Sequence, residues 1–248
     1  QKTAYEIRPR DWSSDVCSSD LVYKIKVPSL KKEFQFRPFL VKEEKLLLMA
    51  KESENSSDIL SVIKQIINNC SMDPKFDVNK LAVFDLEYVF LKLRAISVDN
   101  MVKVSYKDNE DQKVYDFDID LNKIEVIFPE KTENNIKITN KSGIVMRYPS
   151  AELYDDKDFL NLEKDYMFEL IVRCIDTIYY EDQVYSSKDY KKEDLNEFLE
   201  SLDIKTFDKI QQFLLSVPRM EHKIQYKNSL GNEREIVLSS LNDFFTLR

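Results

Sequence analysis

The chain has 248 residues and a formal net charge of −8, and its hydrophobic fraction of 43% is typical of a folded protein and excludes a disordered one. It contains only two glycines and one histidine, whereas a chain of this length has about 17 glycines on average. These counts exclude a dinucleotide-binding glycine fingerprint, a P-loop and a zinc motif that needs two histidines.

Residues 1–21 differ from the rest of the chain. They show no helical or strand periodicity and lack the apolar run of a signal peptide. Asp11 to Leu21 resemble an in-frame translation of a common sequencing-library adapter, and Gln1 to Ile7 resemble a translation of the adapter's other end. A natural tail rich in Ser and Asp is the alternative. We expect a non-native, disordered segment that packs on nothing, followed by one folded unit over 22–248.

The first part of that unit predicts strands, then helices, then strands again. Tyr23, Ile25 and Val27 alternate with lysines, as in a half-buried strand, and a second strand containing Phe34 and Phe36 follows. Apolar residues then recur at helical spacing, with Asp85 as the expected cap of one helix. The expected elements are strands over 23–27 and 34–39, helices over 41–51, 59–70 and 86–93, and strands over 101–106, 115–119, 124–128, 136–138 and 144–148.

The second part is mainly helical. We expect helices over 160–179, 195–202 and 203–217, a hairpin over 222–237 and a last helical turn at 241–245. The hairpins at 101–119 and 222–237 are weakly alike, since each is a long-turn β pair followed by leucine and asparagine. Strands and helices are segregated, so the sequence predicts an α+β fold of helices packed with antiparallel hairpins. We expect one compact domain, with a two-lobed form divided near 149–158 as the alternative.

Few residues suggest catalysis. His222 lies in a strand pattern without a local nucleophile, so an ordinary half-exposed histidine is the favoured interpretation and a small hydrolase using His222 or an acidic pair is the alternative. Cys70 and Cys174 occupy apolar helical stripes and are expected to be buried thiols. Two acidic clusters are expected to be solvated, not metal-binding: Asp116, Asp118 and Asp120, and Asp155, Asp156 and Asp158.

The composition also limits the partners. The sequence pI is about 5.0, and basic residues are interleaved with acidic ones, which disfavours nucleic acid. No apolar run reaches the roughly 18 residues of a membrane span. We therefore expect no nucleic-acid, membrane or small-molecule partner and no cofactor.

Several segments together resemble one family. The resemblance runs in order from about Lys24 to Phe245 and is carried by FQFRPFLVKEEKLLLMAKES, DILSVIKQIINNC, FDLEYVFLKLRAISV, GIVMRYPS, ELIVRCIDTIYY, YKKEDLNEFLESL and NEREIVLSSLNDFF. The chain resembles the baseplate hub proteins of T-even-type (myovirus) bacteriophages, which are described as hub subunits or as assembly chaperones of the hub. Some members carry paired cysteines in the hairpins, whereas this chain has none there, so we expect no zinc and stabilisation by polar turns and cross-strand packing.

The resemblance implies a non-enzymatic viral structural or assembly protein that binds other hub and tail proteins. It also implies a location in the host-cell cytoplasm during tail assembly, and in the virion baseplate for a structural subunit. The expected contact residues are polar or aromatic, as interface anchors usually are: Arg37, Pro38, Phe39, Arg94, Tyr148, Phe244 and Phe245. For Arg37 and Arg94 an internal ion pair is an equal alternative, and for the two C-terminal phenylalanines a fold back into the core is the favoured one.

Overall fold

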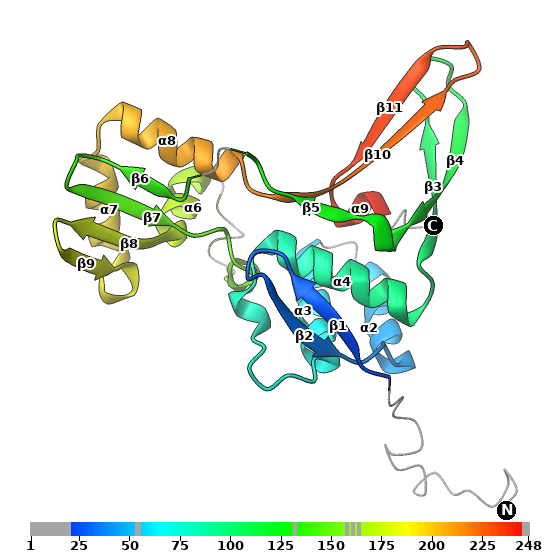
Figure 1. Cartoon of the computed structure of the whole chain (residues 1–248), viewed down its shortest axis with the longest axis horizontal. Coiled ribbons are helices and arrows are strands. Elements are labelled where there is room, and N and C mark those ends of the chain that lie inside the picture. Colours follow the sequence, from blue (N-terminus) through cyan, green and yellow to red (C-terminus); the bar gives the residue numbers. More distant parts are fainter. Residues whose placement is uncertain are drawn as a thin grey trace, which may run out of the picture.

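The chain folds into two groups of helices and strands, each with its own hydrophobic core (Figure 1). The computed structural model describes residues 21–52, 56–130, 133–156, 159, 162 and 165–244. The predicted adapter-like segment therefore lies outside the described residues, apart from Leu21. We call residues 21–130 and 217–244 the first lobe, and residues 133–216 the second lobe. Helices combine with antiparallel sheets in both, which confirms the predicted α+β class.

The first lobe is built from both ends of the described chain. Its N-terminal part contains β1 (Tyr23–Val27), β2 (Lys32–Phe36), α2 (Val41–Glu52), α3 (Ser56–Cys70), α4 (Val83–Ser97), β3 (Met101–Lys107), β4 (Val114–Asp120), the short 3₁₀ helix η2 (Leu121–Lys123) and β5 (Glu125–Ile127). Its C-terminal part adds β10 (Arg219–Lys227), β11 (Glu233–Leu238) and α9 (Leu241–Phe244). Strand β10 lies between β11 and β5, so the last strands complete a sheet begun a hundred residues earlier.

Helix α4 is the centre of the first lobe. Its predicted stripe of Leu86, Val89, Phe90 and Leu93 is buried, and so is Leu91 on another side of the helix. A helix that is apolar on most of its circumference must be covered on most sides. Accordingly, α4 contacts α3, β1, β5 and β10. The predicted stripe of α3, from Ile59 to Cys70, is buried at Ile63, Ile66, Ile67 and Cys70, while Ile59 is half-buried against the same core.

The second lobe is a four-stranded sheet with helices on one face. The strands lie in the order β6 (Asn135–Lys137), β7 (Ser142–Met146), β8 (Ile175–Tyr180) and β9 (Gln183–Ser186). Ile136, Ile144 and Ile175 pack with residues of the helices, including Ile171, Leu199 and Ile210. The remaining elements are the 3₁₀ helix η4 (Ser187–Asp189) and the helices α6 (Tyr166–Cys174), α7 (Lys192–Glu200) and α8 (Ile204–Leu215). The 3₁₀ helix η3 (Ala151–Asp155) lies within this span of the chain but contacts α3 and adds Ala151 to the first core.

The expected helix over 160–179 is wrong in its second half. Helix α6 ends at Cys174, and the chain continues directly as β8. The segment IDTIYY is rich in β-branched and aromatic residues, and Ile178 pairs with Ile144 of β7, so strand pairing prevails over the helical spacing. Strand β9 was not expected, because its turn contains Glu181 at a φ of 52° instead of a glycine.

The two-lobed alternative placed the division between the lobes near 149–158, and the structure places it elsewhere. Strands β6 and β7 lie before that point, yet they pair with β8 and belong to the second lobe. Residues around 150 instead connect the lobes: Val83 N donates to Pro149 O at 3.0 Å, and Ala151 N donates to Leu81 O at 2.8 Å. The chain therefore enters and leaves the second lobe near residues 130 and 217.

Candidate interaction site at the paired hairpins

The hairpins β3–β4 and β10–β11 contain the same short pattern. Residues 103–108 read KVSYKD and residues 223–228 read KIQYKN. Val104 and Ile224 occupy the second position of the pattern, and both are buried. Tyr106 and Tyr226 occupy the fourth position, and their ring centroids lie 6.4 Å apart in an edge-to-face arrangement. The likeness of the two segments is the sequence feature that could have pointed to this site. The spacing of residues alone did not predict that the two hairpins lie against each other (Figure 1).

The loops of the two hairpins also have the same construction. Asp108 Oδ1 accepts a hydrogen bond from Glu110 N at 2.7 Å, and Asn228 Oδ1 accepts one from Leu230 N at 3.1 Å. Each loop then contains one residue in the left-handed region, Gly231 at a φ of 89° and Gln112 at 60°. Glycine adopts this conformation without strain. Only the β10–β11 loop has a glycine at this point, whereas the β3–β4 loop has Gln112.

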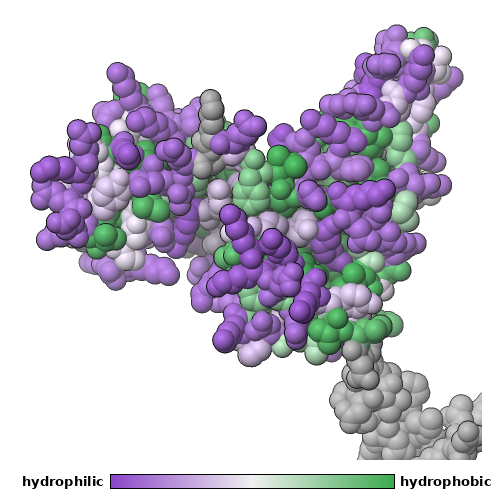
Figure 2. All heavy atoms as spheres, viewed as in Figure 1, coloured by the Kyte–Doolittle hydropathy of each residue, from purple (hydrophilic) through white to green (hydrophobic). Residues whose placement is uncertain are grey.

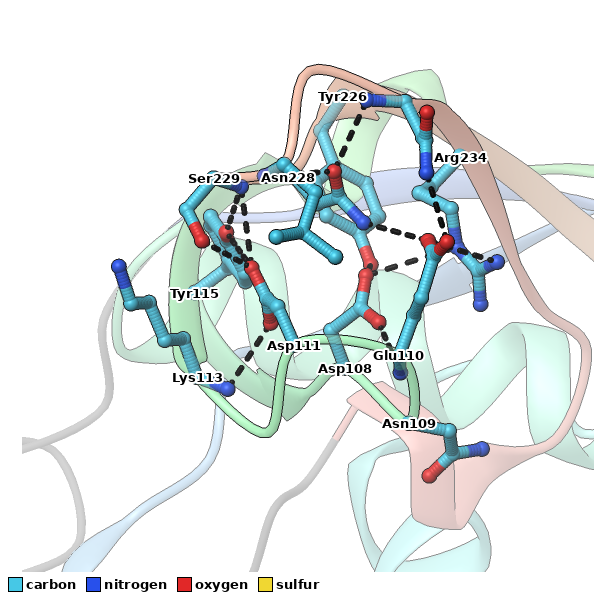
Figure 3. A network of polar contacts seen from close by, with 12 residues as sticks. Asp108, Asn109, Glu110, Asp111, Lys113, Tyr115, Tyr226, Asn228, Ser229 and Arg234 are labelled. Carbon is cyan, nitrogen blue, oxygen red and sulfur yellow. Dashed lines mark hydrogen bonds and ion pairs between the residues drawn. The ribbon is translucent and has the colours of Figure 1, made fainter.

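Polar side chains join the two loops (Figure 3). Glu110 accepts hydrogen bonds from Asn228 Nδ2 at 2.7 Å and from Asn232 Nδ2 at 2.6 Å. Asp111 accepts two hydrogen bonds from Ser229, one from its backbone N at 3.0 Å and one from its Oγ at 2.8 Å. We call this set of contacts between loops 108–113 and 228–232 the tip lock.

A buried carboxylate lies beneath the tip lock. The Asp108 side chain is 0% exposed; it accepts a hydrogen bond from Tyr226 Oη and lies 3.5 Å from Arg234 Nε. The hydrogen bond from Tyr226 is the main cause of a lowered pKa of Asp108. Burial, followed by the same bond, raises the pKa of Tyr226 to about 12. Asp108 is therefore ionised and Tyr226 protonated at neutral pH, and the contact persists there.

The tip lock holds the two hairpins in a fixed position relative to each other. The Tyr226 ring also contacts Tyr115 at 5.0 Å and Phe117 at 5.3 Å, so an aromatic cluster supports the polar one. Together the hairpins form an arm that extends away from the helices (Figure 1). A rigid, extended arm suits recognition of another protein, because little conformational freedom is lost on binding.

The predicted contact residues lie in three separate places. Arg37 follows β2 and makes an internal ion pair, with its Nη2 2.9 Å from Glu43 Oε1. Phe39 is half-buried: its ring lies 5.7 Å from that of Phe90, and its backbone N donates to Ser97 Oγ at 2.9 Å. Arg94 lies half-buried on α4, and Pro38 is half-buried beside Arg37.

The remaining predicted contact residues lie elsewhere. Tyr148 lies between the lobes, 5.2 Å from Phe84 and 5.3 Å from Phe213 between ring centroids. Phe244 is 1% exposed, so it packs in the first core as the fold-back alternative expects. Phe245 lies outside the described residues. The structure thus does not bring the six described residues together, and the contact of all seven with a partner stays a prediction.

The candidates for chemistry have structural surroundings. His222 pairs with Leu238 in the β10–β11 ladder and is half-buried. Burial raises the pKa of Cys70 to about 11 and that of Cys174 to about 12, so both thiols are protonated at neutral pH. Such thiols are poor nucleophiles and poor metal ligands.

The acidic clusters are tied into local contacts. Asp116 accepts a hydrogen bond from Ser105 Oγ at 2.7 Å, and Asp120 accepts one from Asn100 Nδ2 at 2.9 Å. Asp156 lies 2.7 Å from Arg173 Nη2, and Asp155 pairs with Lys64; Asp158 lies outside the described residues. Within the described part of the chain, no three His, Cys, Asp or Glu side chains are grouped to hold a metal ion.

The expected cap of α4 has a different role. The helix starts at Val83, so Asp85 lies in its first turn, where its carboxylate accepts a hydrogen bond from Ser29 N at 3.0 Å. Burial raises the pKa of Asp85, and the bonds from Ser29 oppose that rise. Asp85 therefore fixes the β1–β2 turn against the central helix. None of the helices among the described residues is both long and apolar enough to cross a membrane.

Comparison with known proteins identifies the family. Searches of the curated proteins and of the solved structures each returned no match. Residues 20–246 match the family described as T4 bacteriophage base plate protein. This match covers more than half of the chain and includes both lobes and the paired hairpins. The chain therefore belongs to the T4 bacteriophage base plate protein family.

Proposed function

We propose that this chain acts in the central hub of the phage baseplate, as a hub subunit or as an assembly factor, and that it works by binding other baseplate and tail proteins without catalysing a reaction. The family match over residues 20–246 carries this proposal, because it includes both lobes. The resemblance of the sequence segments to baseplate hub proteins supports the more specific assignment to the hub. The protein then acts in the host-cell cytoplasm while tails are assembled.

The arm formed by the paired hairpins supports a binding role. It is held at its tips by the tip lock, and Leu230 at the β10–β11 turn is exposed. A fixed arm with an exposed apolar side chain at its end gives a partner apolar surface to bury on binding.

Co-expression tests the proposed binding. The whole chain, carrying an affinity tag, is expressed with each baseplate and tail protein of the same phage, and captured proteins are identified by mass spectrometry. Capture of at least one hub protein is expected. Failure of every hub protein to bind would contradict the proposed function.

The composition of virions separates the two roles. A hub subunit remains in purified virions at a fixed copy number, whereas an assembly factor is present in baseplate intermediates and absent from virions. Quantitative mass spectrometry of both samples distinguishes these outcomes. Absence from both samples would contradict either role.

A further inference from the structure

The sheet of the second lobe ends in an open edge at β9. The strand order is β6-β7-β8-β9, and β9 pairs only with β8 among the described residues. In an antiparallel pair, residues alternate between those that bond to the neighbouring strand and those whose backbone groups point the other way. Glu181 N donates to Lys141 O on the β7 side, so Tyr179 also bonds toward β7. Val184 lies opposite Tyr179, so its N–H and C=O point outward from the edge.

In the part of the chain that the structure describes, this edge lacks the usual protection. Natural edge strands are guarded by Lys, Pro, bulges or covering segments. Strand β9 reads QVYS, and the register with β8 is regular over all four pairs. The Val184 side chain is 68% exposed. Bare backbone groups and an exposed β-branched side chain are the features that a partner strand uses.

The adjoining face of the sheet lies on the side away from the second core. Tyr179 lies beside Val184 on the side away from the helices, since neither belongs to the second core. The Tyr179 ring lies over Gly143, where a Cβ would come within 2.8 Å of Ile136 O and collide with the ring. The hydroxyl of Tyr179 donates to Asn135 Oδ1 at 3.0 Å. These contacts hold the Tyr179 side chain against β6 and β7.

The charge of the protein is concentrated in the same lobe. Residues 133–216 contain 18 acidic and 11 basic side chains, a net charge of −7, while residues 22–132 and 217–248 together are neutral. Around β9 the excess is local: residues 175–190 carry four acidic side chains and one basic one, all exposed. Hydrophilic side chains accordingly dominate the visible face of this lobe (Figure 2). Such a surface attracts a basic partner and repels an acidic one.

We propose that β9 is a docking edge for an extended, Lys- and Arg-containing segment of another baseplate protein, which adds to the sheet as a fifth strand beside β9. This inference rests on the proposed function, since the partner is a baseplate protein. Backbone hydrogen bonds to Val184 supply the pairing, and the acidic excess selects the basic strand. A second copy of this chain is disfavoured as the occupant, because two β9 edges would bring like charges together.

Val184→Pro is the direct test. The substitution removes an outward N–H that no strand among the described residues uses, so the fold is kept, as it is for proline at free edge positions. Val184→Thr is the matched control, because it keeps the N–H and the β-branched shape. Circular dichroism and thermal unfolding of both variants check that the sheet is intact.

The whole chain and both variants are co-expressed with each baseplate protein, and the dissociation constant of any captured pair is measured at 0.1 M and 0.5 M NaCl. For the partner of this edge, V184P is expected to weaken binding by about tenfold or more, V184T by less than about threefold, and high salt to weaken the wild-type pair. Hydrogen exchange of the complex is expected to slow at residues 183–187.

Three results would overturn the proposal. Equal binding by V184P and V184T would show that the edge is not used, while leaving the proposed function standing. Protection in the complex confined to other segments would show the same. A dimer of the chain alone that V184P abolishes would assign the edge to a second copy. If the wild-type chain captures no baseplate protein, the proposed function fails as well. This outcome can be told apart from the other three, because in those the loss or change is seen only when the variants or the complex are examined.

Discussion

At the scale of single residues, buried charges determine how this protein responds to substitution and to pH. The Glu43 side chain is 0% exposed and accepts hydrogen bonds from Arg37 Nη2 at 2.9 Å and from Leu40 N at 2.8 Å. Burial raises the pKa of Glu43, but the bonds from Arg37 and Leu40 outweigh it, and the net pKa is lowered. The pair fixes the segment between β2 and α2.

Glu43→Gln is expected to lower the free energy of unfolding by about 2 kcal/mol at pH 7, because it leaves the Arg37 guanidinium without its charged partner. The lowered pKa means that the stabilisation is present above the unfolded-state pKa near 4.5 and is lost as the pH falls through the folded-state value. Urea denaturation from pH 7 to pH 3 measures both effects. Lys42→Gln is the control, since Lys42 is 67% exposed and its pair with Glu43 is worth little. Equal loss in both variants would contradict the prediction.

Glu87 responds to pH in the opposite direction. It lies on α4, facing α9; burial, followed by the charge of Asp243, raises its pKa to about 7, while a hydrogen bond from Leu241 N lowers it. The folded protein therefore holds a proton that the unfolded chain releases between about pH 4.5 and 7, and this group makes the protein less stable as the pH rises through that window.

Glu87→Gln is expected to stabilise the protein by about 2 to 3 kcal/mol at pH 8 and to leave it nearly unchanged at pH 4.5, because one pKa unit corresponds to about 1.4 kcal/mol. Urea denaturation at the two pH values checks this. Glu200→Gln, at the exposed end of α7, serves as the control. A stability difference between E87Q and wild type that is independent of pH would refute the assignment.

At the scale of elements, the two hairpins depend on each other. The tip lock and the aromatic cluster around Tyr226 join residues about 118 positions apart in the chain. Tyr226 belongs to both, since its ring contacts Tyr115 and Phe117 and its hydroxyl bonds to Asp108.

Tyr226→Phe is expected to keep the ring contacts and to remove the hydrogen bond to the buried Asp108. The loops 108–113 and 228–232 should then open more often, and their amide hydrogens should exchange about tenfold faster, as expected for loss of one hydrogen bond to a charged group. Hydrogen exchange measured by mass spectrometry tests this. Tyr106→Phe, the equivalent position of the other hairpin, is the control and should leave exchange in both loops unchanged.

Local patterns predicted most elements but not all of their partners. The buried stripes of α3 and α4 were predictable, because apolar residues at helical spacing lie on one face of a helix, and that face packs against the core. Strand β8 was not, because the helical pattern of α6 continues into it and only pairing with β7 decides its form. The likeness of KVSYKD and KIQYKN was visible in the sequence, whereas the contact between Asp108 and Tyr226 depends on tertiary packing. Arg37 was predicted with two alternatives; the structure shows its internal ion pair with Glu43, and its contact with a partner stays a prediction.

At the scale of the whole molecule, Tyr148 connects the two cores. Its ring stacks on Phe213 of α8 and meets Phe84 of α4 edge to face, and Phe84 in turn contacts Phe128 after β5. Lys64 of α3 adds a hydrogen bond to Ala151 O at 3.2 Å. Cooperative unfolding of the two lobes should depend on this small set of contacts.

Tyr148→Ala is expected to separate the unfolding of the lobes, because it removes the aromatic contact shared by Phe84 and Phe213. Calorimetry should show one transition for wild type and for Tyr148→Phe, and two transitions for Tyr148→Ala. A single transition in Tyr148→Ala would indicate that backbone pairing around Pro149 is enough to couple the lobes.

The return of the chain to the first lobe has a consequence for biosynthesis. The second core uses residues between Ile136 and Phe213, whereas the first core needs Met220, Leu238 and Phe244 in addition to residues near the N-terminal end. During translation, the inserted lobe is therefore complete first. The earlier-made helices around Leu86 must wait, with apolar surface uncovered, until residues 219–244 have left the ribosome. Long-range contacts of this kind slow folding, so we expect the nascent first lobe to be the part that requires host chaperones.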